Sequence, residues 1–86
     1  MIMEYSIRFT PFFEKQLRKL KKKDIVVFQR LTKKLKEIKS NPNHYKPLRN
    51  MLKGNRRAHL NPFIIIFDIK HDLITVHYVK HHDNAY

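Results

Sequence analysis

The sequence predicts an α+β domain with the element order β-α-α-β-β-β, in which a small antiparallel sheet carries an N-terminal helical hairpin on one face. Three observations indicate this fold. A short alternating segment opens the chain, two amphipathic segments with helical spacing follow, and the last third contains segments of strand length. With a length of 86 residues, the chain is expected to form a single domain over residues 1–86.

The first predicted strand lies within residues 1–9. Its apolar and aromatic side chains fall at every second position, which is typical of a half-buried strand: Tyr5, Ile7 and Phe9. Thr10 and Pro11 then indicate the start of a helix. A threonine hydroxyl can accept a hydrogen bond from a free backbone N–H, and proline at the first helical position loses no N–H that the helix needs. The apolar stripe of this helix contains Phe13, Leu17 and Leu20.

The second helix is predicted from about Asp24 to Lys39, with the Asp24 carboxylate as its N-cap. Its apolar side chains recur at helical spacing: Phe28, Leu31, Leu35 and Ile38, with Ile25 one turn earlier. A very short turn separates the two helices. They are therefore expected to pack as an antiparallel hairpin whose apolar stripes face the sheet.

Three strands are predicted in the last third of the chain. Residues 40–43 contain helix-stop and loop signals, and Gly54 indicates a turn before the strand Arg56–Leu60. The strand Phe63–Ile69 follows the Asn61-Pro62 turn and is apolar on both faces, so it is predicted to be central. A loop at residues 70–72 leads to the last strand, Leu73–Val79.

The charge of the chain indicates an anionic partner. Nineteen Lys and Arg residues against seven Asp and Glu give a formal net charge of +12. Nucleic acid is the favoured partner because each neutralised phosphate releases condensed counterions, whereas an acidic protein and an anionic membrane surface are alternatives. The chain contains no cysteine and no apolar run near the roughly 20 residues of a membrane span, so a cytoplasmic location and no membrane partner are expected.

Three stretches together resemble the RelE/ParE superfamily of toxins from bacterial and archaeal toxin–antitoxin pairs: YSIRFTPFFEKQLRKL, NPNHYKPLRNMLKGNRRAHL and FIIIFDIKHDLITVHYVKHHDNAY. The resemblance covers nearly the whole chain. It implies two helices packed on a small sheet and a cognate, acidic, RelB-like antitoxin. The RelE branch implies a ribosome-dependent endoribonuclease that cuts mRNA and thereby inhibits translation, whereas the ParE branch implies inhibition of DNA gyrase without nuclease activity.

RNA cleavage without a metal requires a general base, a general acid and positive charge around the phosphorus. Histidine suits both proton roles, and lysine and arginine supply the charge. The strand histidine of the YafQ-like branch resembles His59, and the basic-then-aromatic pair near the end resembles His82 and Tyr86. The predicted catalytic residues are His59, His82, Tyr86 and Arg57. The predicted phosphate-binding residues are Lys46, Arg49, Lys53 and Arg56, and a general RNA or ribosome surface is expected at Lys21, Lys22, Lys23, Lys33 and Lys34.

Other interpretations of these residues stay open. His59 is also compatible with a solvated strand position, His82 with a polar tail, and Tyr86 with a cap on the core. The roles of acid and base are not divided between His59 and His82. Ile64 stands where many RelE-type strands have an arginine, which favours an alternative function as a ParE-like toxin or a catalytically weak, RNA-binding toxin relic. No metal, cofactor or small-molecule ligand is predicted.

Overall fold

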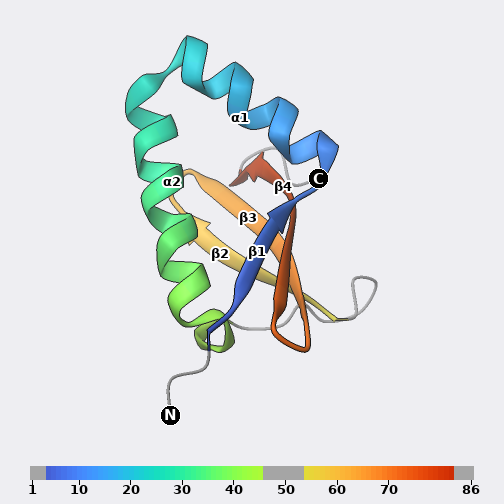
Figure 1. Cartoon of the computed structure of the whole chain (residues 1–86). Helices are drawn as coiled ribbons and strands as arrows, with labels where there is room; N and C mark the ends of the chain where they lie inside the picture. The colour runs from blue at the N-terminus through green and yellow to red at the C-terminus, as the bar shows by residue number, and fades with distance from the viewer. Residues whose placement is uncertain (1–3, 46–53, 83–86) are drawn as a thin grey trace.

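The computed structural model of the chain describes residues 4–45 and 54–82. Its elements follow the predicted order, and the α+β class is confirmed (Figure 1). They are β1 (Ser6–Phe9), α1 (Pro11–Lys23), α2 (Ile25–Ser40), the short 3-10 helix η1 (Pro42–His44), β2 (Asn55–Leu60), β3 (Phe63–Lys70) and β4 (Leu73–His81). Within the described residues, no helix is long and apolar enough to cross a membrane.

The sheet is mixed, and not wholly antiparallel as the sequence predicted. Its strand order is β1-β4-β3-β2; β3 is antiparallel to both neighbours, but β1 runs parallel to β4. The reason lies in the two helices, which bring the chain back to the level where β1 began. There the Asn43 side chain donates a 2.8 Å hydrogen bond to the Tyr5 hydroxyl. From that level β2 runs in the direction of β1, and two hairpin reversals give β4 the same direction.

Helix α1 continues the sheet edge where β1 ends. Phe9 is the last β1 residue paired with β4, opposite Val76. Beyond it, the Thr10 hydroxyl donates to the His77 carbonyl oxygen at 2.8 Å and accepts from the Phe13 N–H at 3.1 Å. The Gln16 side chain then binds the Val79 backbone twice, donating to its carbonyl oxygen at 2.8 Å and accepting from its N–H at 2.9 Å. The second half of β4 therefore keeps backbone partners on this edge.

The core lies between the two helices and one face of the sheet. The buried side chains of the sheet in this core are Ala58, Ile65, Phe67, Ile74, Val76 and Val79, and those of the helices are Phe13, Leu31, Leu35 and Ile38. The predicted apolar stripes are confirmed at these helical positions. Ile25 is an exception, because at 50% exposure it does not continue the stripe of α2.

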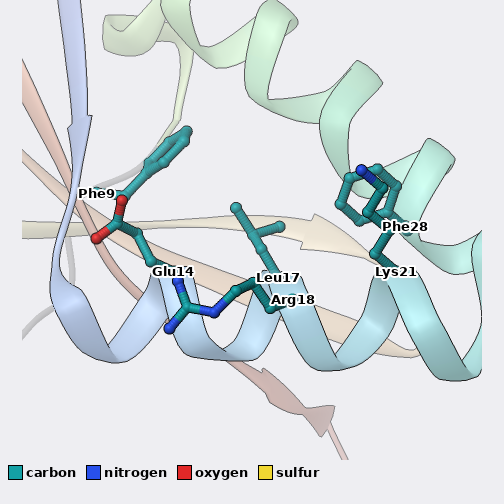
Figure 2. A pocket seen from close by; sticks show the side chains of 6 residues that line it. All are labelled: Phe9, Glu14, Leu17, Arg18, Lys21 and Phe28. Carbon is teal, nitrogen blue, oxygen red and sulfur yellow. The ribbon is translucent and has the colours of Figure 1, made fainter.

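The helices are joined by a tight turn but then spread apart over the sheet, instead of lying side by side as a hairpin (Figure 1). Asp24 ends α1 and caps α2, accepting from the Val27 N–H at 3.2 Å. A depression of about 300 Å³ lies between the helices and is lined in part by Leu17 of α1 and Phe28 of α2 (Figure 2). The buried side chains of both helices belong to the same core as those of the sheet.

Two backbone positions in the turns require a left-handed conformation. Gly54 has a φ of +94° immediately before β2, as its predicted turn requires. His71 has a φ of 57° in the two-residue turn between β3 and β4. This tight turn confirms the predicted loop. Strand β4 is longer than predicted, because it continues to His81 instead of ending at Val79.

We predict that Gln16→Ala lowers the free energy of unfolding by about 1–3 kcal/mol, because the Val79 N–H and carbonyl oxygen lose their partner. Urea denaturation followed by circular dichroism measures the change. Gln29→Ala, at an exposed position of α2, is the matched control. Equal midpoints for the two variants would show that α1 does not hold the edge of β4.

Candidate functional site

The face of the sheet turned away from the helices, here called the open face, carries basic and histidine side chains of β2 and β4. Alternation along β3 places Ile64 and Ile66 on this face, yet they are only 5% and 1% exposed. Across the strands, Ile64 lies between His59 and Lys80, and Ile66 lies between Arg57 and Tyr78. The open face therefore has an apolar floor with polar and cationic side chains on both sides.

The structure brings the two predicted catalytic histidines together. The ring centroids of His59 and His82 are 6.3 Å apart, and the rings are tilted by 42°. The backbone N–H of His82 donates a 2.7 Å hydrogen bond to the Pro62 carbonyl oxygen in the turn between β2 and β3. This bond ties the end of β4 to the turn that follows His59. Both side chains are exposed, so a polymer in solution can reach them.

A pocket lies at the outer edge of β2, where α2 and η1 approach that strand. We call it the edge pocket, and its described lining residues are Lys34, His44, Tyr45, Arg57 and His59. Its volume is about 390 Å³. Because Arg57 and His59 also belong to the open face, the pocket is continuous with the position of the histidine pair. It offers two cations and two imidazoles to an anionic ligand.

Several predicted site residues do not join this group. Arg56 points to the opposite side of β2 from its neighbour Arg57 and donates to the Tyr45 carbonyl oxygen at 2.7 Å. Lys33 is exposed on α2, and Lys21, Lys22 and Lys23 are exposed at the end of α1. Lys46, Arg49, Lys53 and Tyr86 lie outside the described residues, so their roles stay predictions.

Two separate side-chain interactions lie at the other end of the open face. The His77 Nε2 atom lies 2.7 Å from the Asp68 Oδ2 atom, and the Arg8 Nε donates to the Thr75 hydroxyl at 3.1 Å. His77 is the extra residue where the register between β3 and β4 shifts, as in a β-bulge. Within residues 4–45 and 54–82, no group of three or more His, Cys, Asp or Glu side chains could hold a metal ion.

Sequence reasoning missed Lys80, Tyr78 and His44 as members of the site. Lys80 could have been identified because Val79 faces the core, and the next residue of a strand faces the opposite side of the sheet. Tyr78 follows the bulge, so simple alternation before it gives no guide. His44 enters the edge pocket from η1, whose position depends on contacts between distant segments.

Comparison with known proteins identifies the family. Residues 7–86 match the family model of the ParE toxin of the type II toxin–antitoxin system parDE. The chain belongs to the RelE/ParE superfamily of type II toxin–antitoxin toxins. It is 39% identical over 85 residues to a protein of Methanocaldococcus jannaschii that carries the toxin name RelE4, covering 95% of this chain and 90% of that protein.

Solved structures of RelE/ParE toxins show the same fold. The toxin–antitoxin complex RelBE2 of Mycobacterium tuberculosis contains a chain with a TM-score of 0.80 at 22% identity, covering 94% of each chain. YafQ of E. coli aligns with a TM-score of 0.71 at 22% identity, covering 96% of this chain and 99% of that one. At such identities the likeness supports the arrangement of helices and sheet, and it leaves the chemistry to the residues of this chain.

His77 at the bulge and His59 on β2 should differ in their contribution to the free energy of unfolding. We predict that His77→Gln, which removes the contact with the Asp68 carboxylate, lowers the free energy of unfolding by up to about 1 kcal/mol, because the pair is partly exposed. His59→Gln should leave the free energy of unfolding nearly unchanged, because the His59 side chain is exposed. Urea denaturation followed by circular dichroism measures both changes, and an equal loss of stability in the two variants would contradict this difference.

Proposed function

We propose that this RelE/ParE toxin is a metal-free endoribonuclease that cuts mRNA on the ribosome and so inhibits translation. The observation that carries the proposal is the approach of His59 and His82, with ring centroids 6.3 Å apart beside cationic side chains. An imidazole acts over hydrogen bonds of about 2.6–3.2 Å. Two rings at this separation can therefore both reach oxygen atoms of a single phosphodiester group.

In the proposed reaction the ribose 2′-oxygen attacks the adjacent phosphorus, so the O2′–P bond forms and the P–O5′ bond breaks. One histidine accepts the proton of the 2′-hydroxyl, and the other, protonated beforehand, donates a proton to the leaving 5′-oxygen. The products are a 2′,3′-cyclic phosphate and a 5′-hydroxyl end, with no net gain or loss of protons by the pair. Either histidine of the His59–His82 pair can begin as the base.

Charge develops on the phosphorane oxygens during this reaction. Arg57 and Lys80 lie on opposite sides of the apolar floor and would supply positive charge toward a phosphate between them. Tyr86 is proposed to complete the site by stacking on a base, and Lys46, Arg49 and Lys53 to hold neighbouring phosphates. Arg56 is the weakest of the proposed phosphate ligands, because its side chain already binds the Tyr45 carbonyl.

We predict that His59→Ala and His82→Ala each lower the cleavage rate by about 100-fold or more, because each removes a proton-transfer group. The double variant should be only slightly slower than either single one, since the histidines act as a unit. The measurement is cleavage of mRNA on programmed ribosomes, with mapping of the 5′-hydroxyl ends. His71→Asn, in an exposed turn whose left-handed conformation asparagine tolerates, is the control.

Absence of new 5′-hydroxyl ends while the wild-type toxin still binds the ribosome would overturn the nuclease proposal. Full cleavage by the combined His59→Ala and Tyr86→Ala variant would retain the activity but show that the site is elsewhere.

We also propose that a cognate acidic, RelB-like antitoxin neutralises the toxin in the cytoplasm. The net charge of +12 favours an acidic partner, and the related RelBE2 toxin was solved as a toxin–antitoxin complex. A short acidic protein encoded by the neighbouring reading frame should co-purify with this chain when both are expressed. Failure of that protein to bind, or to relieve toxicity, would contradict the pairing.

A second candidate function is inhibition of DNA gyrase without RNA cleavage. Two observations favour it: the matching family model describes ParE, and the apolar Ile64 occupies the centre of the open face. DNA breaks that depend on gyrase, appearing on expression without loss of mRNA, would select this function over the nuclease. Loss of mRNA without such breaks would select the nuclease.

A further inference from the structure

Lys34 differs from every other lysine of α1 and α2, both of which the structure describes in full. The others are exposed along their helices, whereas the Lys34 side chain is only 22% exposed. Its Nζ atom lies 5.5 Å from the centroid of the Tyr45 ring and 3.6 Å from the Glu37 Oε1 atom. The ammonium group is therefore held in one region by an aromatic ring and a carboxylate.

Tyr45, which contacts Lys34, is itself fixed by the core. Its ring packs edge-on against the buried Phe67 at a centroid distance of 5.8 Å, and its carbonyl oxygen accepts the 2.7 Å hydrogen bond from Arg56. His44 lies against the same ring at 5.2 Å. Because the partner ring is anchored, Lys34 would lose little conformational freedom when it binds a ligand.

The edge pocket has the composition of an anion-binding site. Among its described lining residues, Lys34 and Arg57 are cations, His44 and His59 are imidazoles, and none is a carboxylate. These side chains come from α2, η1 and β2. A volume of about 390 Å³ lies within the usual range of roughly 300–1,000 Å³ for ligand pockets. The pocket shares His59 with the pair proposed to transfer protons.

We propose that the edge pocket binds a phosphate group of the RNA strand next to the cleaved bond, with Lys34 as its anchoring cation. The inference rests on the proposed function, in which RNA is the substrate. In the unbound toxin, the Glu37 carboxylate forms an ion pair with the Lys34 ammonium group. When RNA binds, phosphate oxygens take the place of this carboxylate. Lys34 is thus a substrate-binding residue that helps to hold the RNA strand beside His59 and His82.

The alternative is a purely structural lysine whose stem covers Tyr45 while its ammonium group pairs with Glu37 on the same helix. The two cases differ in RNA affinity and in its salt dependence. Lys34→Ala should weaken binding of a short, uncleavable 2′-O-methyl RNA by about tenfold. The slope of log affinity against log salt should fall by about 0.7, the value for one phosphate contact to a single strand.

Lys36→Ala is the matched control, since Lys36 is an exposed lysine of the same helix and loses the same charge. It should weaken binding by less than about threefold through the general field. A second comparison has the opposite sign. Glu37→Gln frees Lys34 from its carboxylate and should tighten RNA binding more than Glu14→Gln, an exposed glutamate of α1 that lines the other depression.

Fluorescence anisotropy over a series of salt concentrations measures these affinities, and the urea midpoint of each variant checks its folding. Equal effects of Lys34→Ala and Lys36→Ala, together with equal effects of Glu37→Gln and Glu14→Gln, would overturn the inference. If Lys34→Ala lowers stability as well, the comparison of the two glutamate variants decides alone.

Cleavage kinetics separate this inference from the proposed function. With both correct, Lys34→Ala should raise KM for RNA about tenfold and change kcat little, unlike the histidine variants. If the wild-type toxin cuts no mRNA but Lys34→Ala still selectively weakens RNA binding, the pocket is supported and the nuclease is overturned. Cleavage that is equally efficient in Lys34→Ala and Lys36→Ala would leave the nuclease and overturn the pocket.

Discussion

The arrangement of this toxin depends on how α1 binds the backbone of β4. Strand β1 covers only the first half of β4, and the hydroxyl of Thr10 and the amide of Gln16 bond to the second half. Those bonds hold β4 between α1 and β3 up to His81. The next residue, His82, is tied to Pro62 and comes within reach of His59. The side chains of Thr10 and Gln16 therefore help to hold the strand that leads to His82, one of the two histidines proposed as acid and base.

Most of the fold follows from local patterns in the sequence. The caps at Thr10 and Asp24, the apolar stripe of α2 and the double-sided apolar strand β3 are all confirmed. The parallel pairing of β1 with β4 could not be predicted in this way, because it depends on where α2 ends relative to Tyr5. The spreading of the helices was missed for a similar reason. Short turns favour hairpins, but here each apolar stripe packs on the sheet.

The candidate site was predicted in part. Resemblance to a known family pointed to His59 and His82, and the structure adds their proximity, which spacing in the sequence does not contain. Lys34 looked like one member of a lysine-rich helix face. What distinguishes it is Tyr45, eleven positions later and anchored on Phe67. Such a difference between neighbouring lysines arises only from tertiary packing, so composition and periodicity cannot show it.

Ile64 gives the site its particular electrostatic character. The resemblance to RelE-type strands implies an arginine at this position, whereas here an isoleucine only 5% exposed lies between His59 and Lys80. The cationic groups therefore stand beside the floor of the site instead of at its centre. Apolar side chains beneath a phosphate exclude water, and charge-assisted hydrogen bonds strengthen as water is excluded. In the proposed reaction, the half-buried Lys80 can then act on a phosphate more strongly than an exposed cation in bulk solvent. The isoleucine thus changes where the charge is placed and does not by itself remove the means to stabilise an anionic transition state.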